Sequence, residues 1–358
     1  MDLIEIAKQF CLDREPLDAQ PYGCGHINDT YCVTATDKRY ILQRINHRIF
    51  PNVEGLMNNI VSVTDVIRKQ VLQNGGDVER ECLQVIPTKD GKSYLECDGN
   101  YYRMYVFVEK TLSLQVVENP IHFYYAASAF GQFQRRLADF PAETLCEIIP
   151  NFHNTASRFR DFEAAVARDK MGRAASVQRE IEFVRARKAD TEKIVSLLES
   201  GELPLRVTHN DTKLNNVLLD EETGKPMAVI DLDTVMPGSA LYDFGDSIRF
   251  GTNPAAEDEK DLSKVFCDVM LFEEYTKGFL EACGENLTDK EKELLPFSGY
   301  LMTLECGMRF LADYLDGDVY FKIHYPEQNL DRCRTQIKLA ADIQEKMDEL
   351  CAIVKKYA

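Results

Sequence analysis

The chain has 358 residues, a formal net charge of −17 at pH 7 and 45% hydrophobic residues. Because nucleic acids and anionic membranes bind basic patches, this acidic charge argues against either partner. No apolar run reaches about 18 residues, so no membrane-spanning helix is expected. The first residues lack the features of a signal peptide. The 11 cysteines are scattered without a C-x-x-C pair, which predicts reduced thiols. We therefore expect a cytoplasmic protein long enough for two lobes.

A glycine-rich turn is the first motif along the chain. Gly23 and Gly25 precede Asn28, and predicted strands follow over 31–34 and 39–44. In kinases such a flap covers the triphosphate of ATP, because glycines let the backbone come close. A plain hairpin turn explains the pattern about as well, but the motifs further along the chain favour the flap.

The second of these strands lacks the lysine that kinases place there. Gln43 occupies that position, with Arg44 beside it. A helix is predicted over 53–73, and its only early carboxylate is Glu54, so the lysine–glutamate ion pair of kinases is expected to be absent. We predict that Arg44 or another cation reaches the phosphates instead.

Further along, the sequence predicts one strand and several helices. The strand spans 101–108, and apolar residues at helical spacing predict a core helix over 119–137. The charged segment 158–199 has interspersed apolar positions, which is typical of helices with solvated faces.

The most informative segment begins at Thr208. Asp211 and Asn216 have the spacing of the kinase loop H-R-D-x-x-x-x-N, in which the Asp accepts the substrate hydroxyl proton and the Asn binds magnesium. Lys213 is a candidate contact for the transferred phosphoryl group. The alternative for such an Asp is an ordinary turn or cap residue.

A predicted hairpin follows this loop. Apolar strands over 216–219 and 227–230 flank a polar turn, which returns Asp231 beside Asn216. Carboxylate and amide oxygens there can share Mg²⁺ with ATP phosphates. We predict Asn216 and Asp231 as ligands, with Asp233 as a further candidate. His209 and Asp243 are expected to hold the shape of the catalytic loop by hydrogen bonding.

A predicted helix over 301–315 is apolar nearly all round except for three charges. Glu305, Arg309 and Asp313 are spaced four residues apart and therefore lie on one face. They can form a solvent-exposed salt-bridge stripe or line a polar sugar pocket, and the residue pattern alone leaves both open.

Together, these motifs resemble a known group of enzymes. The catalytic loop, Ile230–Asp233 and Leu241–Asp246 are similar to the aminoglycoside phosphotransferase and choline kinase superfamily. Within it, the whole chain resembles the N-acetylhexosamine 1-kinases. The narrower match rests on Tyr22–Asn28, Arg206–Asn216, Met236–Ser239, Gly245–Gly251 and Glu305–Tyr314.

The resemblance implies an α+β, bilobal, protein-kinase-like fold. Residues 1–108 would form a nucleotide-binding lobe with a small antiparallel sheet and a helix. Residues 109–358 would form a mainly helical lobe for catalysis and sugar binding. By the same resemblance, Phe107 and Val108 lie where backbone groups bind adenine.

The activity implied is ATP- and Mg²⁺-dependent phosphorylation of the anomeric hydroxyl of N-acetylglucosamine or N-acetylgalactosamine, with Asp211 as base. The resemblance favours the pocket interpretation of Glu305, Arg309 and Asp313 and adds Tyr320 as a sugar contact. A monomer and a small homo-oligomer are equally acceptable.

Two alternatives remain open, the first within the same superfamily and the second from a different class of function. A kinase for an aminoglycoside or an amino alcohol would bind a cation, which Arg309 would repel. A catalytically silent nucleotide-binding protein would fit the missing strand lysine, but it has no chemical need for Asp211, Asn216 and Asp231. A protein kinase is disfavoured because no D-F-G to A-P-E segment follows Asp231.

Overall fold

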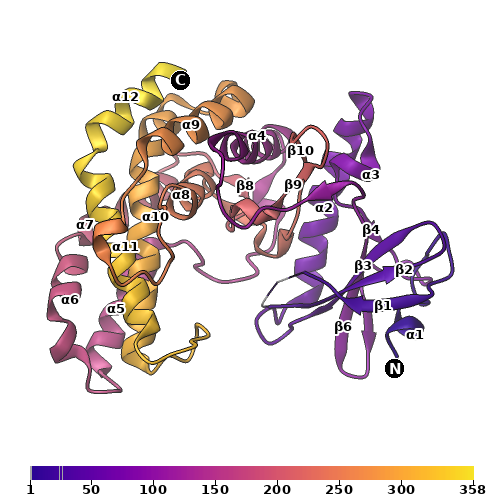
Figure 1. The fold of residues 1–358 in the computed structure, drawn as a ribbon, viewed down its shortest axis with the longest axis horizontal. Helices are drawn as coiled ribbons and strands as arrows, with labels where there is room; N and C mark the ends of the chain where they lie inside the picture. The colour runs from indigo at the N-terminus through magenta and orange to yellow at the C-terminus, as the bar shows by residue number, and fades with distance from the viewer. Residues whose placement is uncertain (1, 24, 26) are drawn as a thin grey trace. The chain divides into compact units, whose positions relative to one another are not determined.

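The computed structural model describes residues 2–23, 25 and 27–358. Cys24 and His26 of the predicted glycine-rich turn lie outside these described residues. The chain divides into two compact units. Unit 1 comprises Met1–Ser113, Asp139–Pro150 and Val217–Pro237, and unit 2 comprises Leu114–Ala138, Asn151–Asn216 and Gly238–Ala358. Unit 1 contains a small antiparallel sheet and unit 2 is mainly helical (Figure 1), which confirms the predicted α+β fold class.

The main sheet of unit 1 has six strands in the order β1-β2-β3-β6-β4, with β5 also paired to β6. Their bounds are β1 Asp18–Pro21, β2 Asp29–Thr34, β3 Arg39–Ile45, β4 Val85–Ile86, β5 Leu95–Cys97 and β6 Asn100–Val106. The predicted strands 31–34 and 39–44 fall inside β2 and β3. The predicted strand 101–108 corresponds to β6, which ends two residues earlier than expected. Antiparallel register pairs Gln43 with Thr30 on one side and with Arg103 on the other.

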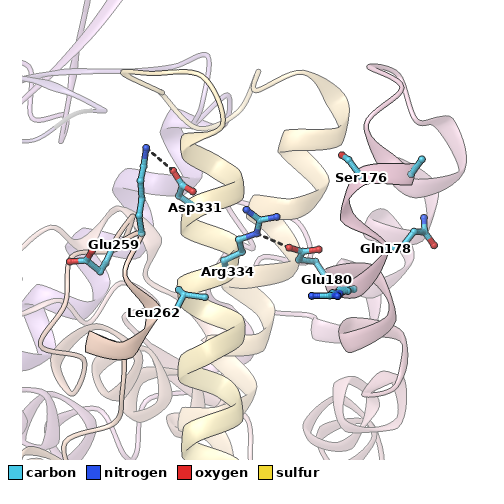
Figure 2. A pocket seen from close by; sticks show the side chains of 10 residues that line it. Ser176, Gln178, Glu180, Glu259, Leu262, Asp331 and Arg334 are labelled. Atoms are coloured by element: carbon cyan, nitrogen blue, oxygen red, sulfur yellow. Dashed lines mark hydrogen bonds and ion pairs between the residues drawn. The ribbon is translucent and has the colours of Figure 1, made fainter.

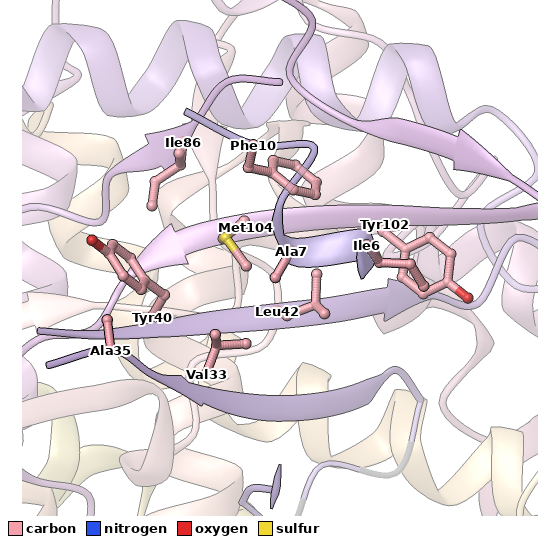
Figure 3. Packing of buried hydrophobic residues seen from close by; sticks show 10 residues of the cluster. All are labelled: Ile6, Ala7, Phe10, Val33, Ala35, Tyr40, Leu42, Ile86, Tyr102 and Met104. Carbon is pink, nitrogen blue, oxygen red and sulfur yellow. The ribbon is translucent and has the colours of Figure 1, made fainter. Parts of the chain in front are cut away.

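One face of this sheet carries the core of unit 1. Figure 3 shows Ile6 and Ala7 of helix α1 (Leu3–Ala7), together with Phe10, packed on side chains from the strands. Leu42 and Met104 at its centre are fully buried. Alternate residues of a strand point to opposite faces, so Gln43 and Arg103, one position away from these two, point to the other face.

Helix α2 (Val53–Gln73) has the bounds predicted from the sequence. It begins there because the side chain of Asn52 accepts a hydrogen bond from the Gly55 amide at 2.9 Å. Helix α3 (Val78–Glu81) follows. A three-stranded sheet in the order β10-β9-β7 completes unit 1, with β7 Thr111–Leu112, β9 Val217–Asp220 and β10 Pro226–Val229. The predicted hairpin is therefore present as β9 and β10.

Unit 2 is built around the helix α10 (Asp289–Asp316), which packs on α5, α8 and α11 (Figure 1). The helices of this unit are α4 Pro120–Arg136, α5 Thr155–Arg168, α6 Gln178–Arg185, α7 Lys188–Glu199, α8 Ala240–Gly251, α9 Val269–Cys283, α11 Gln328–Glu345 and α12 Met347–Tyr357. The short strand β8 (Arg206–Thr208) directly precedes the catalytic loop in sequence, and the short strand β11 (Met236–Gly238) directly precedes α8.

Two glycines allow the close helix packing of unit 2. A Cβ atom at Gly278 of α9 would lie 2.4 Å from the carbonyl oxygen of Tyr124 on α4, and one at Gly245 of α8 would lie 2.4 Å from that of Ser298 on α10. Helix α10 itself begins with a capping box formed by Thr288 and Glu291. Among the described residues no helix is long and apolar enough to cross a membrane, and no disulfide forms.

Candidate active site

The catalytic loop follows β8 and is held by a buried carboxylate of α8. Asp243 accepts hydrogen bonds from the backbone amides of His209 and Asn210 at 3.0 and 2.8 Å, and from the side chain of Gln134 at 2.7 Å. Burial raises the pKa of Asp243, although these donors oppose the rise. Asn210 has a φ of 65°, a strained value for a non-glycine residue, so the loop needs such anchoring. The predicted structural role of Asp243 is confirmed.

His209 also has the predicted structural role. Its ring is fully buried and packs edge-on against Phe130 and Phe133 of α4, with ring centroids 5.5 and 5.9 Å away. Its Nδ1 atom accepts the backbone N–H of Asp211 at 3.3 Å. The ring therefore fixes the turn into Asp211 from inside unit 2.

Three predicted catalytic-loop residues lie together in unit 2. Lys213 forms an ion pair with Asp211 at 2.7 Å, and both side chains are partly exposed. Burial would lower the pKa of Lys213, but Asp211 outweighs it and raises this pKa. Asn216 donates from its amide nitrogen to the Asp211 backbone oxygen at 2.8 Å and carboxylate at 3.2 Å. These contacts use the amide nitrogen of Asn216 and not its oxygen.

A second carboxylate of α8 supports the loop one residue beyond the candidate base. Asp246 accepts the Thr212 amide at 3.1 Å and pairs with Arg249 at 2.8 Å. Burial would raise the pKa of Asp246, but Arg249 and other nearby cations lower it overall. Ser247 donates to the Thr212 carbonyl at 2.8 Å. Asp211 therefore lies between two segments of backbone that α8 holds in place.

The charged face of α10 is buried rather than displayed to solvent. Glu305 is 1% exposed and lies 3.0 Å from Nδ1 of His153 and 3.7 Å from Arg309. The other ring nitrogen of His153 lies 3.1 Å from the backbone oxygen of Asn210. The solvent-exposed stripe considered for these charges is therefore wrong.

Asp313 holds the loop that carries Tyr320. Its carboxylate accepts the backbone amides of Val319, Tyr320 and Phe321 at 2.8–2.9 Å, and the side chain of Asn329 at 2.9 Å. The Tyr320 side chain is 65% exposed. The guanidinium of Arg309 lies 5.8 Å from the centre of its ring. Arg309 and Tyr320 therefore form a polar and aromatic pair on one side of α10.

The remaining predicted metal ligands belong to unit 1. In the hairpin, Val229 pairs with Val217, so the strand leading to Asp231 runs back beside the strand that follows Asn216 in sequence. Asp231 is exposed and has a φ of 59°. Asp233 is buried; it accepts from Asn28 of the glycine-rich turn at 2.6 Å and forms an ion pair with Arg103.

Arg103 is a fully buried cation that the sequence analysis did not select. Its Nε donates to Gln43 at 2.9 Å, and Gln43 in turn donates to Thr30 at 2.9 Å. Arg103 thus connects Gln43, the residue in the strand-lysine position, with Asp233 through a hydrogen bond and an ion pair. A single arginine among the apolar residues of β6 was the available signal.

The other predicted nucleotide-site residues are placed as follows. Arg44 points to the exterior and pairs with Asp29, both about half exposed. Gly23 has a φ of 77°, which favours glycine, and both Gly23 and Gly25 have open space where a Cβ would lie. Phe107 packs edge-on against Tyr22, with ring centroids 5.5 Å apart, and Val108 is buried. The glycine-rich turn and the end of β6 thus meet within unit 1.

A separate hollow of about 620 Å³ lies in unit 2 among α6, α11 and the segment before α9 (Figure 2). Its charged walls are joined by ion pairs of Arg334 with Glu180 at 2.6 Å and of Lys260 with Asp331 at 3.6 Å. None of the predicted site residues lines it.

The comparison with protein families finds that residues 18–270 match the family described as "Phosphotransferase enzyme family". Among solved structures, an aminoglycoside phosphotransferase from Alicyclobacillus acidocaldarius is similar with a TM-score of 0.63 and 15% identity, covering 99% of this chain and 97% of that one. A microcompartment-associated aminopropanol kinase has a TM-score of 0.60 and 15% identity, covering 97% of both chains. A spectinomycin phosphotransferase, solved with ADP and spectinomycin, has a TM-score of 0.58 and 15% identity, covering 97% and 98%. At these identities, the solved structures support the protein-kinase-like fold.

Proposed function

Because this chain belongs to the phosphotransferase enzyme family, we propose that it transfers the γ-phosphoryl group of ATP to the anomeric hydroxyl of an N-acetylhexosamine. The observation that carries the proposal is the catalytic loop, in which Asp211 and Lys213 form an ion pair on backbone anchored by Asp243. A loop with such anchoring can position a base with a cation nearby, and phosphoryl transfer depends mainly on such positioning and on charge neutralisation.

The proposed mechanism gives each of these side chains one task. Asp211 accepts a hydrogen bond from the attacking hydroxyl, orients it and takes its proton as the new P–O bond forms. Lys213 leaves its ion pair with Asp211 far enough to contact the transferred phosphoryl group, whose charge it partly neutralises. The products are the hexosamine 1-phosphate and ADP.

The residues present fit a magnesium ion in part. Asn216 keeps its amide oxygen out of the contacts to Asp211, and Asp231 is exposed, so both are suitable oxygen ligands. Asp233 fits less well, because Arg103 and Asn28 already engage its carboxylate. Among the described residues no group of three His, Cys, Asp or Glu side chains could hold a metal. Mg²⁺ commonly takes one or two protein ligands and completes its shell with phosphates and water. When bound, it would neutralise phosphate charge.

We place ATP against the glycine-rich turn, with Gly23, Gly25 and Asn28 near the phosphates and Phe107 and Val108 near adenine. Arg103 is a better candidate than Arg44 for the cation that replaces the strand lysine. It lies opposite Gln43, the residue in the strand-lysine position, whereas Arg44 points to the exterior. A guanidinium keeps its charge even when it is buried.

For the sugar, we propose Arg309 and Tyr320 as the direct contacts. The guanidinium can donate to hydroxyl or acetamide oxygens, and the exposed aromatic ring can cover a sugar face. Glu305 and Asp313 were also predicted as direct contacts. However, the carboxylate of Glu305 is engaged by His153, and that of Asp313 accepts from three backbone amides and Asn329. We therefore assign these two carboxylates to holding the pocket.

A cationic acceptor is the second candidate function. It is favoured by the solved structures with the same fold, which include an aminopropanol kinase. Arg309 beside Tyr320 opposes it, since a cation bound there would be repelled.

The deciding experiment measures ADP release with Mg-ATP across N-acetylhexosamines, plain hexoses, choline, homoserine, aminopropanol and aminoglycosides, while the reducing end of each sugar is followed. Turnover with an N-acetylhexosamine and equal loss of reducing ends would support the proposal. Turnover with an amine alone would replace it by the second candidate. Absence of turnover with every acceptor would favour a catalytically silent protein.

A further inference from the structure

One buried histidine joins the catalytic loop to α10. His153 precedes α5 and is 7% exposed. Its Nε2 lies 3.1 Å from the backbone oxygen of Asn210, and its Nδ1 lies 3.0 and 3.3 Å from the two oxygens of Glu305. Asn210 is the strained residue directly before Asp211.

Both partners of the His153 ring are acceptors. A backbone carbonyl has no proton to give, and an ionised carboxylate has none either. A neutral imidazole donates from only one nitrogen, so it would face one of these acceptors with a lone pair. Both contacts are satisfied when the ring carries two N–H groups, as an imidazolium.

The charged groups around His153 act in the same direction. Burial alone would lower its pKa, but Glu305 on α10, Asp246 on α8 and the Asn210 carbonyl outweigh it and raise that pKa. Arg309 on α10 and Arg158 on α5 face the same carboxylate of Glu305. Tyr242 of α8 packs on the ring at 5.5 Å and is itself neutral, because burial raises its pKa.

We propose that His153 is a positioning residue, which as an imidazolium ties the loop before Asp211 to Glu305. The proposal rests on the proposed function only in taking Asp211 as the catalytic base. Loss of one ring proton removes one of the two hydrogen bonds of His153. The ring then no longer binds both the Asn210 carbonyl of the catalytic loop and Glu305 of α10. Turnover then falls at high pH, although Asp211 itself is unchanged.

The first test needs no acceptor. In the full-length protein labelled with [¹⁵N]histidine, we expect the ring signal that disappears in His153→Gln to show both nitrogens protonated at pH 7.5. A neutral His153 at pH 7.5 would overturn the proposal. This result does not depend on which acceptor the enzyme uses, so it separates failure of the inference from failure of the proposed function.

The second test uses kinetics with any acceptor that wild type turns over. His153→Gln should lower kcat about 10–100-fold through misplacement of the base, with the KM for ATP changed less than about twofold and the alkaline fall in kcat removed. Glu305→Gln keeps the side-chain shape and should move that fall to lower pH. His122→Gln on α4 is the matched control for histidine replacement. An unchanged alkaline limb in both His153→Gln and Glu305→Gln would refute the positioning role.

Discussion

Replacing Arg103 by Met tests the buried network of unit 1 directly. The side chains of Arg103 and Asp233 are 1% and 5% exposed, so the substitution leaves a carboxylate in the interior without its ionic partner. Removing one member of such a buried pair typically costs about 3–5 kcal/mol. Gln43 also loses its donor, which adds to the cost. We expect a loss of unfolding free energy within that range at pH 7.

Arg44→Met is a matched control for this substitution. It makes the same chemical change on the neighbouring strand and breaks the pair with Asp29, in which the two side chains are 46% and 49% exposed. Exposed ion pairs contribute about 0–1 kcal/mol, because water screens them. The contrast between the two variants therefore isolates the effect of burial.

The assay is urea unfolding combined with hydrogen exchange of the β2 and β3 amides, so that unit 1 is followed separately from unit 2. Asp233→Asn in the Arg103→Met background should recover part of the loss, since it removes the unpaired charge. ATP affinity of both arginine variants should be measured in parallel, and Arg103→Met should weaken it more. The reasoning fails if Arg103→Met costs no more than Arg44→Met, or if the double variant is as unstable as the sum of the two single ones.

Three other changes have defined outcomes. Asp211→Asn should lower kcat about 10²–10⁴-fold, the usual contribution of a general base, while ATP binding by calorimetry stays within about twofold; near-normal turnover would remove Asp211 from its role. Burial would raise the pKa of Glu305, but His153, Arg309 and Arg158 lower it, so wild type should lose stability as pH falls below about 4.3, the usual Glu value, and Glu305→Gln should lose less in acid melts. Gly278→Ala places a methyl group 2.4 Å from the Tyr124 carbonyl and should cost about 1–3 kcal/mol by overpacking, whereas Gly284→Ala, where φ is −55° and the nearest atom would lie 3.6 Å from the new methyl group, should not show a clash.

Much of the fold followed from local patterns in the sequence. Helix α2 was predicted with its observed bounds, and the structure adds that the side chain of Asn52 caps its first turn. The hairpin after Asn216 was predicted because two short apolar runs enclose a polar turn. Such signals depend on residues that are close in sequence, which is why they can be read without a structure.

The supporting residues of the site could not be read in the same way. His153 contacts Asn210 and Glu305, which lie 57 and 152 residues further along the chain. Arg103 and Asp233 are 130 residues apart, and nothing in the local spacing of either indicates a partner. The charges of α10 were assigned to one face correctly. Which of them are proposed to contact the sugar and which to hold the pocket depends on the groups that pack against Glu305 and Asp313, and these come from distant parts of the chain.

The way in which Asp313 holds the Tyr320 loop bears on how acceptor preference can diverge among related enzymes. Its carboxylate binds the main-chain amides of Val319, Tyr320 and Phe321, which any residue except proline provides. The exposed side chains of Val319 and Tyr320 can therefore be exchanged while the loop keeps its attachment, whereas Phe321 also packs on Phe310 with ring centroids 4.6 Å apart. With Tyr320 as the proposed acceptor contact, substitutions at Val319 and Tyr320 should alter which acceptor fits with little loss of stability, so these two positions are a suitable place to begin engineering a different acceptor.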